Sequence, residues 1–161
     1  MLQKLIKIVH EIGAVGVMGS LAASLVLIAT APKHSWVAYA AVRQGIAALT
    51  RWLLVPSLAI VLISGLLAIA ANRTYANAGW AWVKALLGLG MFEGTLISMD
   101  SGARRAAELS ALAASGHGDA AQLASVLHSE WGTLWLLLAV ALVNILLAVW
   151  RPRLVRRTAP T

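Results

Sequence analysis

The sequence predicts an all-α protein, a bundle of four transmembrane helices with both termini in the cytoplasm. Of the 161 residues, 60% are hydrophobic and 12% are charged, whereas a soluble domain is about 45–50% apolar and about 25% charged. Four apolar stretches approach the ~20 residues that a helix needs to cross a bilayer. We find no internal repeat and expect a single transmembrane domain.

The four predicted spans cover residues 12–32, 52–71, 79–99 and 131–150. Each is expected to be helical, because lipid offers no partner for an unpaired backbone group. The first span follows Lys4 and Lys7, as the apolar region of a signal peptide would. Its apolar part exceeds the ~7–15 residues usual in signal peptides, so we expect it to be retained.

Basic and aromatic residues predict the orientation. Eight basic residues fall on one side of the spans: Lys4, Lys7, Arg73, Lys84, Arg151, Arg153, Arg156 and Arg157. Five fall on the other side: Lys33, Arg43, Arg51, Arg104 and Arg105. Two tryptophan belts match these sides: Trp80, Trp82 and Trp150 inside, and Trp36, Trp52, Trp131 and Trp135 outside. The basic excess predicts cytoplasmic termini in a bacterial inner membrane.

The segments between the spans differ in character. Residues 72–78 predict a tight inner turn, and residues 33–50 predict an outer loop. The stretch "SGARRAAELSALAAS" is rich in helix formers and ends near Gly116 and Gly118. "DAAQ" at 119–122 then predicts a capped helix start. Spans three and four are therefore expected to extend into an outer helical hairpin.

Small residues in two spans predict close helix packing, because they allow membrane helices to approach each other. The predicted contacts are Gly13, Gly16 and Gly19 in span one, and Gly88, Gly90 and Gly94 in span three. Pro56 lies one turn into span two and predicts a kink there.

Span three carries two charges, Lys84 and Glu93. Nine residues separate them, which is half a turn beyond two full helical turns, so their side chains are expected to point to opposite sides. Lys84 can reach the inner interface or pair with Glu11. Glu93 lies deeper and is expected to face the bundle interior, where it is protonated, paired with Arg51 or His128, or part of a proton or ligand site.

Three polar residues are expected to form one layer near the cytoplasmic face: His10, Lys84 and Asn144. Helical bundles build cofactor sites from facing helices, and histidine is a usual ligand of haem iron. His10 is the first candidate axial ligand, with His34 and His128 on the outer side as alternatives. The chain contains no cysteine and four methionines, which argues against a copper(I) pathway.

The order of three stretches resembles the CopD-like superfamily of small integral membrane proteins. These stretches are "KIVHEIGAVGVMGSLAA", "RWLLVPSLAIVLISGLLAI" and "WAWVKALLGLGM". The superfamily includes HemJ-type protoporphyrinogen oxidases, CopD copper-resistance proteins and an uncharacterised branch, which "LLAVWRPRL" resembles. The resemblance to HemJ implies haem b at His10 and a functional role for Lys84. HemJ-type proteins carry a further histidine late in span three, where this chain has "MFEGTL" with Glu93.

Three functions remain open at this point. The first is a membrane protein that binds haem b and has a redox or electron-transfer role, for example as a HemJ-like oxidoreductase. In that protein His10 would ligate the iron and Lys84 would neutralise a propionate or a quinone oxygen. Glu93 would carry protons. The second is a non-catalytic accessory or assembly subunit of a larger membrane complex, or a homo-oligomer. The third is a small metal or solute transporter with Glu93 in its pathway. Nucleic acid is not an expected partner, because the basic residues flank the spans.

Overall fold

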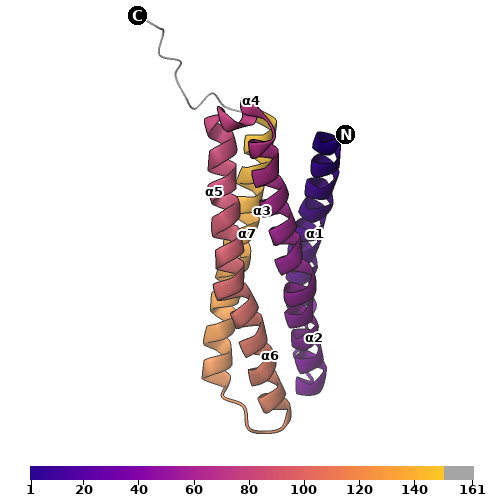
Figure 1. The fold of residues 1–161 in the computed structure, drawn as a ribbon. Helices are drawn as coiled ribbons and strands as arrows, with labels where there is room; N and C mark the ends of the chain where they lie inside the picture. Colours follow the sequence, from indigo (N-terminus) through magenta and orange to yellow (C-terminus); the bar gives the residue numbers. More distant parts are fainter. Residues whose placement is uncertain (151–161) are drawn as a thin grey trace, which may run out of the picture.

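The computed structural model describes residues 1–150, which are almost entirely helical and contain no strand. Four long helical rods make up this part of the chain, and each runs antiparallel to the one before it (Figure 1). The all-α class is therefore confirmed. The first rod is α1 (Leu2–Thr30), which begins ten residues before the predicted first span.

The second rod joins three helical segments without a break. These are α2 (Trp36–Leu49), the π-helical segment η1 (Thr50–Leu54) and α3 (Val55–Ala70). Together they form a continuous helix of 35 residues, about 52 Å long at 1.5 Å per residue. This exceeds the ~30 Å core of a bilayer.

The prediction of a loop at residues 33–50 is wrong. Ser35 caps α2 through its side-chain oxygen, which accepts a hydrogen bond from the Ala38 backbone N–H at 3.3 Å. The following residues are rich in alanine, the strongest helix former. Arg43, which lies within this stretch, is fully buried.

The π-helical segment η1 ends two residues before Pro56. Proline has no backbone N–H and its ring collides with the carbonyl four residues earlier, so a regular α-helical register is disfavoured there. A π-helical turn is one way for a helix to accommodate such a break. At Pro56, where the sequence predicts a kink, the structure shows a π-helical segment followed by α-helix within one continuous rod.

The third and fourth rods form the predicted hairpin. After the short α4 (Arg73–Ala76), the third rod consists of α5 (Gly79–Gly94), the π-helical segment η2 (Thr95–Asp100) and α6 (Ser101–Ala114); the fourth rod is α7 (Ala120–Trp150). Gly116 makes the turn with a positive φ of 82°. Asp119 Oδ1 then accepts a hydrogen bond from the Gln122 backbone N–H at 3.0 Å, as the capping motif predicts.

Within residues 1–150, three helices are long and apolar enough to cross a membrane: Leu2–Thr30, Trp36–Ala70 and Ala120–Trp150. The third rod is not among them, and it carries Lys84 and Glu93 within its apolar stretch. Four of the basic residues used to predict orientation, Arg151, Arg153, Arg156 and Arg157, lie outside the described residues.

Close packing joins α1 to α3. A Cβ atom added at Gly16 would lie 2.2 Å from Ser57 Oγ, and one added at Gly13 would lie 2.9 Å from side-chain atoms of Ile60 and Val61. The glycine contacts predicted in span one are thus confirmed at Gly13 and Gly16. Gly19, Gly90 and Gly94 have no such neighbour within 4 Å, so the packing predicted for them is wrong within this chain.

We expect Gly13→Ala to destabilise the fold, because the new methyl group would overlap the β-branched side chains of Ile60 and Val61 and crowd the Ser57 carbonyl oxygen of α3. Overpacking of this kind costs about 1–3 kcal/mol of unfolding free energy. Unfolding by sodium dodecyl sulfate in mixed micelles measures the change. Gly19→Ala is the matched control and should leave stability nearly unchanged; equal stability of both variants would contradict the packing.

Candidate functional site

A cavity of about 640 Å³ lies between α1, α3, α5 and α7, at the end of the molecule that holds the N-terminus and α4. Its volume falls within the ~300–1,000 Å³ typical of sites for small organic ligands. Its deeper walls are apolar side chains such as Val17, Leu58 and Met91. Polar and basic groups gather toward its other end, so the site suits an amphipathic ligand.

His10 is held in a defined orientation on the wall of this cavity. Its Nδ1 atom lies 3.1 Å from the Val61 carbonyl oxygen and 3.0 Å from Ser64 Oγ. Ser64 donates its own hydroxyl proton to the Ile60 carbonyl, at 2.5 Å. Nδ1 therefore faces two acceptors and carries the imidazole proton in the neutral ring. This leaves Nε2 as the nitrogen with an available lone pair.

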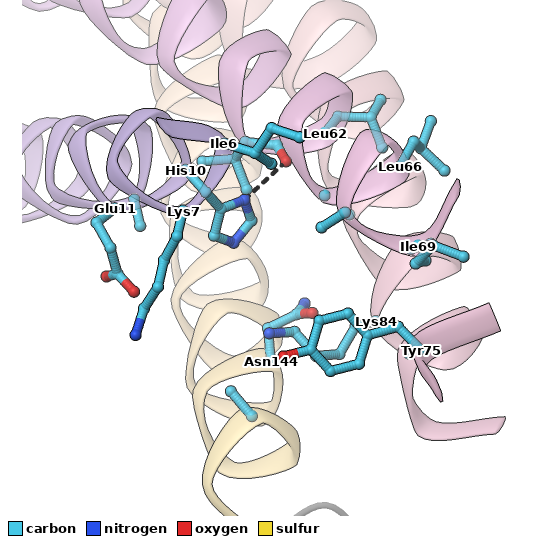
Figure 2. A pocket seen from close by; sticks show the side chains of 18 of the residues that line it. Ile6, Lys7, His10, Glu11, Leu62, Leu66, Ile69, Tyr75, Lys84 and Asn144 are labelled. Atoms are coloured by element: carbon cyan, nitrogen blue, oxygen red, sulfur yellow. Dashed lines mark hydrogen bonds between the residues drawn. The ribbon is translucent and has the colours of Figure 1, made fainter. Parts of the chain in front are cut away.

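Gly65 lies beside the imidazole. A Cβ atom there would lie 3.6 Å from His10 Cε1, in ordinary van der Waals contact with the ring. In Figure 2 the second ring nitrogen of His10 is on the side of the ring that faces Asn144 and Lys84. Among the described histidines, His10 alone lines the cavity; His34 and His128 are exposed.

Lys84, Asn144 and Tyr75 line the cavity with His10, and they come from three different helices. Lys84 is close enough to His10 for an electrostatic interaction, as is Glu11. Asn144 donates to the Val140 carbonyl at 3.2 Å, and its carbonyl oxygen remains available to a ligand. The structure thus brings together the predicted polar layer of His10, Lys84 and Asn144.

The rim of the cavity is basic. Lys4 and Lys7 of α1 line it in addition to Lys84, whereas Glu11 is the one acidic side chain among the described lining residues. Three ammonium groups against one carboxylate favour a ligand whose polar end is anionic.

Glu93 lies on the other side of α5. The half-turn separation from Lys84 is confirmed, because Lys84 lines the cavity and Glu93 is exposed. The prediction that Glu93 faces the bundle interior is wrong. Its proposed partner Arg51 instead binds Asp100, with 3.2 Å between Nη1 and Oδ2, and His128 is exposed.

A second polar cluster, which the sequence did not suggest, lies at the opposite end of the molecule. Arg43 of α2 forms an ion pair with Glu130 of α7, and both side chains are almost completely buried. Arg43 Nε and Nη1 and Glu130 Oε1 have no further hydrogen-bond partner in the described chain. A clue was present: Glu130 immediately precedes Trp131 of the predicted fourth span, where an acidic residue needs a cationic partner.

Asp100 is the third buried acidic or basic side chain of the described residues. Its Oδ2 atom forms ion pairs with Arg51 and with Arg104, and 3.3 Å separates it from Arg104 Nη2. Both arginine side chains are more than half exposed. Asp100 therefore ties the second rod to the third at the level of the two π-helical segments.

Comparison with known proteins gives no further guidance. No protein-family model, no curated protein and no solved structure matches this chain. The resemblance to the CopD-like superfamily stays a prediction.

We expect Glu130→Leu to lower the unfolding free energy by about 3–5 kcal/mol, because it leaves the Arg43 guanidinium buried without a counter-charge. The double variant Glu130→Leu with Arg43→Met should recover most of that loss. Titration with sodium dodecyl sulfate measures both. Glu108→Leu removes an exposed partner of Arg105 and should change stability by less than about 1 kcal/mol. A double variant as unstable as Glu130→Leu alone would contradict the buried pair.

Proposed function

We propose that this chain is an integral protein of the bacterial inner membrane that spans the bilayer four times. Three helices of sufficient length and apolar character support this, and the third rod lies among them (Figure 1). The termini are assigned to the cytoplasm because of the basic residues near them. On this arrangement, the cavity opens near the cytoplasmic face and the α6–α7 hairpin extends outward.

We further propose that the cavity binds haem b through His10. The observation that carries this proposal is the hydrogen bond from Nδ1 to the Val61 carbonyl. Metal-bound histidines commonly donate their other ring nitrogen to a backbone carbonyl, which fixes the tautomer and makes the ligating nitrogen more basic. His10 has this hydrogen bond to a backbone carbonyl, and its Nε2 is the nitrogen that would ligate iron.

The surrounding residues fit the rest of such a cofactor. The apolar walls suit a porphyrin ring, and the basic rim of Lys84, Lys4 and Lys7 suits its propionates or the oxygen of a quinone substrate. Bound haem would supply one-electron redox chemistry. Lys84 and Asn144 would orient the polar end of the ligand, and Glu93 has no part in the cavity because it lies on the opposite face of α5.

This arrangement supports a small membrane oxidoreductase or electron-transfer protein, of the HemJ-like type that the sequence resembles. A second candidate is a non-catalytic subunit of a larger membrane complex. The exposed Glu93 favours this second role, because a carboxylate on a lipid-facing helix is expected to have a partner.

The absorption spectrum of the purified protein tests the haem proposal. We expect a Soret band and a reduced-minus-oxidised α-band change. His10→Ala should remove both while the protein still inserts into membranes. His34→Ala, which alters an exposed histidine, should retain full haem content. A colourless wild-type protein after expression with added haem precursor would refute the proposal and favour the subunit role.

Single cysteines test the topology, because the natural chain contains none. We place them at exposed positions in α4 and in the α6–α7 turn, as Ala76→Cys and Ser115→Cys. A membrane-impermeant maleimide added to intact spheroplasts should label Ser115→Cys and should reach Ala76→Cys only after lysis. Labelling of both from the same side would overturn the four-span arrangement.

A further inference from the structure

The outward side of α5 and η2 is an apolar helical stripe with one charge at its centre. Leu86, Leu89 and Ile97 are exposed by 67%, 42% and 72%, and they follow one another at helical spacing. Glu93 lies in the middle of this stripe and is also exposed. Gly90, one turn before Glu93, has open space where a side chain would be. We call these five residues the α5 face.

The four-span arrangement proposed above places Glu93 well inside the bilayer. Gly88 packs near Leu62 of α3, with 3.8 Å between the position of a Cβ atom and Leu62 Cδ1, and Asp100 pairs with Arg51. Glu93 therefore lies between these two levels, beside the first turns of α3 and near the middle of the second rod. A carboxylate on a lipid-facing surface at this depth is unfavourable unless a partner satisfies it.

The described chain supplies no such partner. Glu93 makes no hydrogen bond or ion pair within residues 1–150. Neither α3 nor α7 contains a lysine or arginine, and the lysines of α1 are confined to its first two turns. Arg51 lies in η1, at the level of Asp100. Residues 1–150 of a second copy in the same orientation would therefore bring no lysine or arginine to the depth of Glu93.

We propose that the α5 face binds a transmembrane helix of a different protein that carries a lysine or arginine at the depth of Glu93. The carboxylate would pair with that cation inside the bilayer. The leucine and isoleucine side chains would pack against the partner helix, and Gly90 would allow the two backbones to approach. This inference rests on the four-span arrangement and is independent of whether haem is bound.

Two synthetic transmembrane peptides test the proposal. Both are leucine–alanine helices of about 22 residues, and they differ at the central position, which is lysine in one and leucine in the other. The full-length protein carries a donor dye on a cysteine introduced at Ser115, the peptides carry an acceptor, and energy transfer is measured in proteoliposomes. We expect the lysine peptide to bind about threefold to twentyfold more tightly than the leucine peptide, the range known for polar pairs between membrane helices.

Two variants assign the effect to Glu93. Glu93→Leu should abolish the preference for the lysine peptide. Glu108→Leu, which removes an exposed carboxylate of α6, should keep it. Equal binding of both peptides by the wild type would overturn the proposal, as would self-association of labelled copies that Glu93→Leu abolishes. If alkaline pH extracts the protein from the liposomes, both the four-span arrangement and this inference are wrong. If the protein stays in the liposomes but shows no preference for the lysine peptide, this inference alone is wrong.

Discussion

The buried ion pair between Arg43 and Glu130 holds the helices together at the α6–α7 end of the molecule, whereas the opposite end contains the cavity. A guanidinium in an apolar interior is tolerated when a carboxylate lies against it, so α2 must lie where Arg43 can reach α7. The helix α6 packs against α2 and buries small side chains, including Ala103 and Ala106. The pair therefore holds α2 in the bundle as the continuation of α3, in a stretch whose sequence looks like a loop.

Asp100 provides a second tie of the same kind, one layer further along. It accepts contacts from Arg51 of the second rod and from Arg104 on its own rod. Two buried carboxylates, Asp100 and Glu130, thus fix the α2–α6–α7 end through charge. Apolar packing of Leu21, Leu54, Met99 and Leu134 fills the centre.

The cavity forms where these ties are absent. Gly13 and Gly16 bring α1 into close contact with α3, and the hydrogen bond of His10 to Val61 continues this contact by one further turn. The cavity between α1 and α5 is apolar at the level of Val17 and Met91, and its polar and basic groups, such as Lys4, Lys7 and Lys84, lie toward the N-terminus of α1. The helix α5 therefore contributes to two surfaces: Lys84 lines the cavity, and Glu93 lies on the outward surface of the bundle.

The sequence alone determined the helical class, because apolar stretches of about 20 residues have few alternatives to a helix. It also determined the hairpin turn at Gly116, the capping at Asp119, and the opposite directions of Lys84 and Glu93, since each depends on local backbone geometry. The layer of His10, Lys84 and Asn144 was predictable from depth along antiparallel helices.

Only the tertiary structure decided which side of each helix faces which neighbour. It buried Arg43, gave Arg51 to Asp100 rather than to Glu93, and turned Glu93 outward. These outcomes depend on the rotation of each helix about its axis, which is set by contacts between residues far apart in the chain, such as Gly16 with Ser57. Helical periodicity fixes the angle between two side chains on one helix, but the packing of all the helices together fixes the direction in which either one points.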